Sequence, residues 1–241
     1  MDIAFSKEIH DFLVIYLDDI MVFSKSDQQH VDHLGHVFTK CRKYGISLNP
    51  KKYLFGLEDE KLIGHIISKD FIWIDPTRIE AILQITHHRS IRELHDFLGK
   101  INFLRRFISN LAELIRLLNN MLKKYSTIKW TLEAKRSFKD IKPALTLTPV
   151  PISPMFDRDF ITFYFASEHT IVAVLLQKND QGFEHPIAFF SKALRDAPLK
   201  YNIMETQAFS LVNVIKDFGV YILHSHIIPY VPDVVVKNIL T

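Results

Sequence analysis

Two adjacent aspartates, Asp18 and Asp19, lie at the centre of the apolar segment LVIYLDDIMVF, residues 13–23. Like charges this close repel each other, and a carboxylate leaves water at a high cost unless a cation or hydrogen bonds compensate. One interpretation is a solvated hairpin turn, since short Asp-containing links join many strand pairs. The other is a pair of oxygen ligands at a sheet edge that hold a divalent metal ion for phosphoryl or nucleotidyl transfer.

The elements that would position this pair are recognisable on both sides of it. LVIY and IMVF are rich in β-branched and aromatic side chains and predict the two strands of a hairpin. Residues 1–13 predict a short amphipathic helix, and the apolar spacing over residues 28–45 predicts a longer one that ends at a glycine. Short strands within residues 48–74 follow. We expect a β-α-β arrangement around the acidic hairpin.

The composition is that of a globular protein. Of the 241 residues, 48% are hydrophobic and 24% are charged, which suffices for one large or two small cores. Cys41 is the only cysteine, so an intramolecular disulfide and a cysteine-rich zinc site are excluded. No apolar run approaches the roughly 18 residues of a membrane span, and residues 1–13 lack the apolar core of a signal peptide. We expect an intracellular protein of the cytoplasm or nucleus that is neither secreted nor membrane-bound.

Beyond residue 75 the apolar residues follow the period of amphipathic helices, three of them up to residue 122 and a fourth over residues 130–145 with Thr131 as its candidate cap. Between Thr86 and Lys142 there are 13 Lys and Arg against 5 Asp and Glu, a net charge of +8 in a chain whose total is +3. This indicates either a polyanion partner or a solvated helical face. The proline-rich TPVPISP predicts a linker, followed by three strands, a long helix and a fourth strand.

Six segments, in this order, resemble the back half of a gypsy-type LTR-retrotransposon polyprotein: YLDD, LNPKKYLF, LIGHIIS, FLGKINFLRRFISN, WTLEAKRSFKDIK and HPIAFFSKALRDAPLKYNIMETQAFSLV. In that family a reverse transcriptase palm and thumb precede a ribonuclease H-like domain. The resemblance covers essentially the whole chain and implies the fold classes α/β and α+β. It implies a partial palm with the YxDD hairpin (1–75), a helical thumb (76–148), a linker (149–156) and an incomplete ribonuclease H-like domain (157–241).

The resemblance also implies catalytic roles in the palm. Asp18, with Asp19 beside it, would hold the catalytic metal ions, Mg²⁺ or Mn²⁺. Tyr16 would lie near the primer terminus and Lys52 near the incoming nucleotide. The metal ions would lower the pKa of the primer 3′-hydroxyl and stabilise the pentacovalent phosphate and the departing pyrophosphate.

An RNA or DNA template-primer would contact two further segments of the chain. LIGHI resembles the primer grip, where a tight turn at Gly64 lets the backbone approach the primer. FLGKINFLRRFI resembles the thumb helix, with Lys100, Arg105 and Arg106 facing the phosphates of the template-primer.

Both catalytic centres depart from the family pattern within these residues. The family's other metal-binding aspartate lies on a strand well upstream of YxDD, together with the fingers, whereas the acids before Asp18 fall on the expected N-terminal helix. In the ribonuclease H-like part, Phe165 replaces an acid, Pro232 occupies the third ligand position, and only Glu205 matches. We expect Phe165 to pack inward, Glu205 to be solvated or hydrogen-bonded locally, and the domain to act as a spacer or docking surface behind the thumb.

These observations predict a fragment of an RNA-directed DNA polymerase. By itself the chain is expected to lack both polymerase and ribonuclease H activity, and to need the missing palm and fingers in trans. Two alternatives remain open at this stage: a non-catalytic module that binds template-primer, and a decayed retroelement relic without a selected function.

Overall fold

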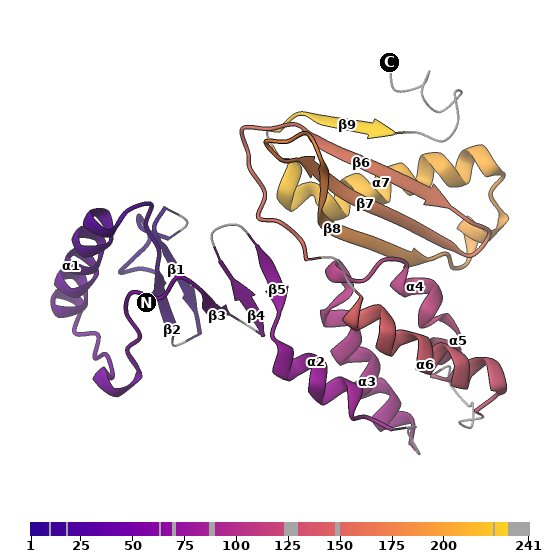
Figure 1. Ribbon diagram of the computed structural model, residues 1–241, viewed down its shortest axis with the longest axis horizontal. Helices are drawn as coiled ribbons and strands as arrows, with labels where there is room; N and C mark the ends of the chain where they lie inside the picture. The colour runs from indigo at the N-terminus through magenta and orange to yellow at the C-terminus, as the bar shows by residue number, and fades with distance from the viewer. Residues whose placement is uncertain are drawn as a thin grey trace. The chain divides into compact units, whose positions relative to one another are not determined.

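The computed structural model consists of two compact units, Met1–Leu57 and Glu58–Thr241 (Figure 1). It describes residues 1–230 with the exception of positions 10, 18, 63, 69–70, 87–89, 123–129, 148–149 and 224. Within the described ranges, no helix combines the length and the apolarity that crossing a membrane requires.

The first unit contains the predicted hairpin and the predicted longer helix. Its elements are β1 (Leu13–Tyr16), β2 (Asp19–Val22), α1 (Asp27–Tyr44) and the 3-10 helix η1 (Pro50–Lys52). The strands pair antiparallel, with Tyr16 opposite Asp19 at the closed end. The Ser26 side chain caps the start of α1, and Gly45, with a φ of 64°, ends it in the left-handed conformation that favours glycine. The hairpin and this helix are confirmed.

The N-terminal segment forms a series of turns, so the expectation of a helix over residues 1–13 is wrong. In a helix the Ala4 carbonyl would accept from the Glu8 amide, but that amide donates to the Phe5 carbonyl instead. The Ala4 carbonyl accepts from Lys40 Nζ on α1, at 3.0 Å. A tertiary partner 36 residues away therefore replaces the local helical bond.

Glu8 anchors these turns to α1. Its side chain is buried, with Oε1 2.6 Å from Lys40 Nζ and 2.9 Å from His36 Nε2. Burial by itself would raise the pKa of the Glu8 carboxyl, but the hydrogen bonds from Lys40 and His36 outweigh it and hold the pKa below its usual value. The apolar residues around this anchor, Ala4, Phe5, Leu13, Val37 and Cys41, form the core of the first unit.

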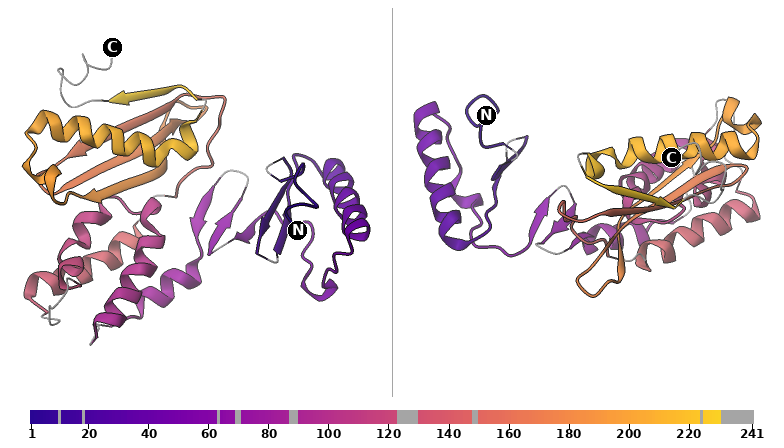
Figure 2. Two further views of the ribbon diagram at one scale, coloured as in Figure 1. Left: turned by 180° about the vertical axis from the view of Figure 1, so that it is seen from behind. Right: turned by 90° about the horizontal axis from the view of Figure 1, so that it is seen from above.

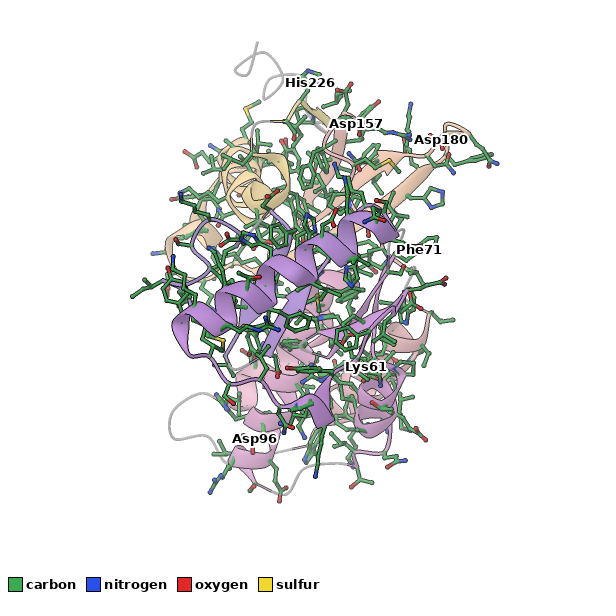
Figure 3. All side chains as sticks on the ribbon, turned by 90° about the vertical axis from the view of Figure 1, so that its left-hand side faces the viewer. Lys61, Phe71, Asp96, Asp157, Asp180 and His226 are labelled. Carbon is green, nitrogen blue, oxygen red and sulfur yellow. The ribbon has the colours of Figure 1, made fainter. Side chains whose placement is uncertain are left out.

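The second unit opens with a small antiparallel sheet of order β3-β4-β5. Its strands are β3 (Glu60–Leu62), β4 (His65–Ile67) and β5 (Ile72–Ile74). Lys61 on the first strand and Phe71 just before the last are labelled in Figure 3. In the described residues these strands form a sheet of their own, so the expected β-α-β arrangement around the hairpin is not found. Because Ile72 and Ile74 pack into the core of the following helices, the unit boundary falls after residue 57, whereas the expected palm runs to residue 75.

The helical segment, residues 76–146, packs around one apolar cluster. Its helices are α2 (Pro76–Leu83), α3 (Ile91–Phe103), η2 (Arg105–Phe107), α4 (Leu111–Leu114), α5 (Arg116–Met121) and α6 (Leu132–Thr146). Ser90 and Glu93 form a capping box at α3, and Thr131 caps α6 as its position predicts. The third predicted helix is interrupted at Ile115, which divides it into α4 and α5.

The C-terminal domain, described over residues 157–230, is a four-stranded sheet with one long helix. Its elements are β6 (Phe160–Ala166), β7 (Thr170–Lys178), β8 (Glu184–Ala193), the 3-10 helix η3 (Ala197–Lys200), α7 (Ile203–Ile222) and β9 (Ile227–Tyr230). The strand order is β8-β7-β6-β9, with β9 parallel to β6. Helix α7 covers one face of the sheet: it lies behind the strands in Figure 1 and in front of them in the left panel of Figure 2. The strands and the long helix are where the sequence predicts them.

The expected linker is bonded to both of its neighbours over its described part. The Ile72 amide of β5 donates to the Pro151 carbonyl, and the Ile152 amide donates to the Pro186 carbonyl of β8. Ile152 also forms an antiparallel bridge with Phe71 and is buried. This segment therefore joins the small sheet to the C-terminal domain as a fixed connection.

Candidate functional site

The YLDD motif closes the β1–β2 hairpin. Tyr16 and Asp19 are paired across the two strands, and both side chains are exposed to solvent. Leu17 has a φ of 53° and is 79% exposed. Two-residue hairpin turns demand such a left-handed conformation, which costs a non-glycine residue on the order of 1–3 kcal/mol. Asp18 lies outside the described residues, so its expected role as metal ligand stays a prediction.

The residues expected to serve polymerisation are divided between the two units. Tyr16, Asp19 and Lys52 belong to the first, where Lys52 ends the exposed turn η1. The second unit holds the residues expected to contact nucleic acid and the ribonuclease H-like position: Gly64, Lys100, Arg105, Arg106 and Glu205.

Gly64 lies in the tight turn between β3 and β4 and has a φ of 75°. The Arg78 guanidinium packs against this position, and the Gly64 carbonyl accepts a hydrogen bond from the Asp75 amide. The left-handed conformation is what favours glycine here. The tight glycine turn is confirmed, while its contact with a primer stays a prediction.

His65, the residue after this turn, connects β4 to the helical segment. Its ring stacks on Phe103 at the end of α3 and on Phe107 of η2, with centroid separations of 5.0 and 5.2 Å. Burial lowers the pKa of His65, and the positive charges of Arg106 and Arg78 lower it further, which favours the neutral imidazole. Our sequence interpretation missed this residue, although it lies inside the LIGHI segment.

Arg105 and Arg106 contact the C-terminal domain, while their expected place facing template-primer phosphates stays a prediction. Arg105 Nη2 donates to the Ser191 carbonyl of β8 at 3.3 Å and lies 3.8 Å from Asp217 Oδ1 on α7. The Arg106 guanidinium lies over the ring of Tyr221, also on α7. The single turn of η2 directs both side chains toward β8 and α7, whereas Lys100 remains on the exposed face of α3.

The contact of α4 with β8 is also polar and buried. The Ala112 amide donates to Ser191 Oγ at 2.9 Å. Nearby, burial raises the pKa of the Asp217 carboxyl above its usual value, although Arg105 and Lys192 act in the opposite direction. The helical segment thus rests on the C-terminal domain through polar bonds and through the contact of Arg106 with Tyr221.

Phe165 is 58% exposed, so the expectation that it packs inward is wrong. Side chains alternate along β6, and those of Phe160 and Tyr164 belong to the cluster with α7. Phe163 and Phe165 therefore lie on the opposite face of the sheet. The apolar side chain of Phe165 predicted burial, but the register of β6 places this residue on the face of the sheet opposite to α7.

Glu205 is exposed and hydrogen-bonded locally, as expected. It closes a capping box at the start of α7: its Oε2 accepts from the Asn202 amide at 3.0 Å, and its own amide donates to Asn202 Oδ1 at 2.9 Å. Pro232, the other departure from the family pattern, lies outside the described residues.

Two family models match separate parts of the chain. Residues 2–79 match "Reverse transcriptase (RNA-dependent DNA polymerase)", and residues 130–228 match "RNase H-like domain found in reverse transcriptase". The chain thus combines a reverse transcriptase segment with an RNase H-like domain.

Curated relatives align with both parts of the chain. It is 32% identical over 225 residues to the Tf2-3 and Tf2-4 transposon polyproteins of Schizosaccharomyces pombe. The alignment covers 93% of this chain but 17% of each polyprotein, so the chain spans about a sixth of the length of these relatives.

Solved structures support the fold. A foamy viral protease-reverse transcriptase in complex with double-stranded DNA superposes with a TM-score of 0.84 at 22% identity, over 99% of this chain and 42% of the viral one. A foamy viral protease-reverse transcriptase bound to an RNA/DNA hybrid gives 0.82 at 22% identity, over 99% and 32%. The expected mixed α/β and α+β fold is confirmed.

We predict that Glu205→Gln leaves the melting temperature of the chain nearly unchanged, with or without magnesium, because glutamine at this position also closes a capping box. Thermal unfolding followed by circular dichroism measures this, and Glu93→Gln in the capping box of α3 is the matched control. A magnesium-dependent rise in melting temperature that disappears only in Glu205→Gln would mean that Glu205 binds metal.

Proposed function

We propose that residues 1–241 are part of the RNA-directed DNA polymerase of a gypsy-type retrotransposon. The observation that carries this proposal is the YLDD hairpin, with Tyr16 opposite Asp19 at its closed end and both exposed. The match of residues 2–79 to the reverse transcriptase family and the Tf2 polyprotein relatives support it.

Divalent metal ions of the Mg²⁺ class fit the donors that the hairpin offers. Asp19 is exposed, and carboxylate oxygens are the ligands such ions prefer. Asp18 and Asp19 would hold the metal, which would activate the primer 3′-hydroxyl for attack on the incoming nucleotide. Tyr16 would orient the primer terminus beside them. Glu8 cannot complete this site, because its carboxylate is buried against Lys40 and His36.

Two adjacent carboxylates on one turn leave most of the coordination positions of two metal ions to other groups. The resemblance assigns a further ligand to an aspartate upstream of YxDD. We therefore propose that these 241 residues do not polymerise by themselves, and that the remaining palm and fingers complete the site in the polyprotein or in trans.

A second candidate function, binding of template-primer without catalysis, is favoured by the exposed cations of the helical segment. Lys100 on α3 and Lys135, Arg136 and Lys139 on α6 are all exposed to solvent. Such side chains bind phosphates without a metal, by releasing the counterions of the nucleic acid.

We predict no primer extension by the purified 241-residue chain on an RNA or DNA template with Mg²⁺ or Mn²⁺. A longer polyprotein segment that supplies the upstream aspartate should extend the primer, and Asp18→Asn should abolish extension there. Gel analysis of a labelled primer measures both. Extension by the 241-residue chain that Asp18→Asn abolishes would contradict the account of the metal site.

For the binding function, we predict that affinity for a primer-template duplex falls as the salt concentration rises. Lys100→Gln should reduce the slope of log affinity against log salt concentration by about one, since one phosphate contact is lost. Fluorescence anisotropy at several salt concentrations measures the slope. Lys178→Gln, an exposed lysine at the end of β7, is the matched control. Equal slopes in the two variants would favour the solvated-face interpretation.

A further inference from the structure

A cavity of about 610 Å³ lies inside the second unit, between the helical segment and the C-terminal domain. Residues of α3, η2, α4 and α5 line one side, and residues of β8, the turn after it and α7 line the other. Its volume falls within the range of small-molecule sites, roughly 300–1,000 Å³. A ligand held there would contact both parts of the chain.

The lining is strongly positive. Arg105, Lys192, Arg195 and Lys216 contribute four cations, whereas Asp217 contributes one carboxylate, so the cavity carries an excess of three positive charges. The cations come from η2, β8, the following turn and α7, and all four residues line this open cavity.

Some of these cations are held in place by neighbouring polar groups. Lys192 Nζ donates to Asn213 Oδ1 at 2.7 Å, and Arg105 is held by the Ser191 carbonyl and by Asp217. Arg195 and Lys216 are exposed and reach the same lining. Phosphate oxygens are commonly bound by arginine guanidinium groups, which donate two hydrogen bonds side by side, together with lysine ammonium groups.

The turn that places Arg195 is strained. Asp196 has a φ of 58° and a ψ of −124°, a backbone conformation that favours glycine. Asp196 directly follows Arg195 and comes two residues before Pro198, and both of these line the cavity. Strain of this kind persists where the surroundings impose it, and it is common beside binding sites.

We propose that this cavity binds a phosphate-bearing anion with at least two negative charges. Arg105 from the helical segment and Lys192, Arg195 and Lys216 from the C-terminal domain share its oxygens. The ligand bridges the two parts and stabilises their contact. The chemistry is that of a phosphate chain, which either free pyrophosphate and nucleotides or the backbone of a nucleic-acid strand can supply. This site is separate from the YLDD hairpin and does not depend on polymerase activity.

The test is thermal unfolding of the 241-residue chain with increasing pyrophosphate at constant ionic strength. We expect a saturable rise in melting temperature, since a ligand of the folded state stabilises it. The double variant Arg195→Gln/Lys216→Gln should weaken the apparent affinity at least about tenfold, because two charge-assisted contacts are lost. Lys216→Arg should retain binding. Lys25→Gln/Lys178→Gln, which removes the same charge from exposed positions outside the cavity lining, is the matched control.

A single-stranded oligonucleotide added at saturating pyrophosphate distinguishes a nucleic-acid backbone from free phosphate compounds as the source of the bound phosphate. Displacement of pyrophosphate that requires Arg195 and Lys216 assigns the site to a nucleic-acid backbone, and unchanged pyrophosphate binding assigns it to free phosphate compounds. The proposal is overturned if pyrophosphate shifts the melting temperature no more than chloride at equal ionic strength. Equal loss of affinity in the control variant Lys25→Gln/Lys178→Gln overturns it as well.

Discussion

The buried hydrogen bond from the Ala112 amide to Ser191 Oγ sets how the helical segment meets the C-terminal domain. Helix α4 has only four residues, and the side chain of its N-cap residue Asn110 makes no capping bond. Its first amides therefore need a partner from outside the helix, and Ser191 provides one. An unpaired amide at this buried position would cost about 1–3 kcal/mol. Strand β8 lies at the edge of its sheet, so this bond determines which edge of the sheet α4 and η2 contact.

The positions of the cationic side chains follow from this contact. Once α4 lies on β8, η2 brings Arg105 to the Ser191 carbonyl and to Asp217, and Arg106 to Tyr221. Within the basic segment, Lys100 stays exposed on α3, whereas Arg105 lines the open cavity beside β8 and α7.

Local signals in the sequence predicted the elements well, but contacts between distant segments decided the rest. The glycine that ends α1 and the threonine that caps α6 act within one turn, so their neighbours suffice to predict them. The turns of residues 1–9 depend on Lys40, and the orientation of Arg105 depends on Ser191, 86 positions along the chain. No local pattern carries such information. Phe165 shows the related limit that apolarity does not reveal which face of a sheet a residue occupies.

Hydrogen exchange of Ser191→Ala tests the central claim, that this bond unites the helical segment and the C-terminal domain, most directly. The account predicts that amides of α6 and of β7 lose protection by the same free energy, about 1–3 kcal/mol, because both open in one cooperative unit. Ser167→Ala is the control, because the Ser167 hydroxyl bonds to Thr170 within the turn that leads to β7. This variant should leave the protection of the α6 amides unchanged. Loss of protection in β7 with full protection retained in α6 would contradict the account.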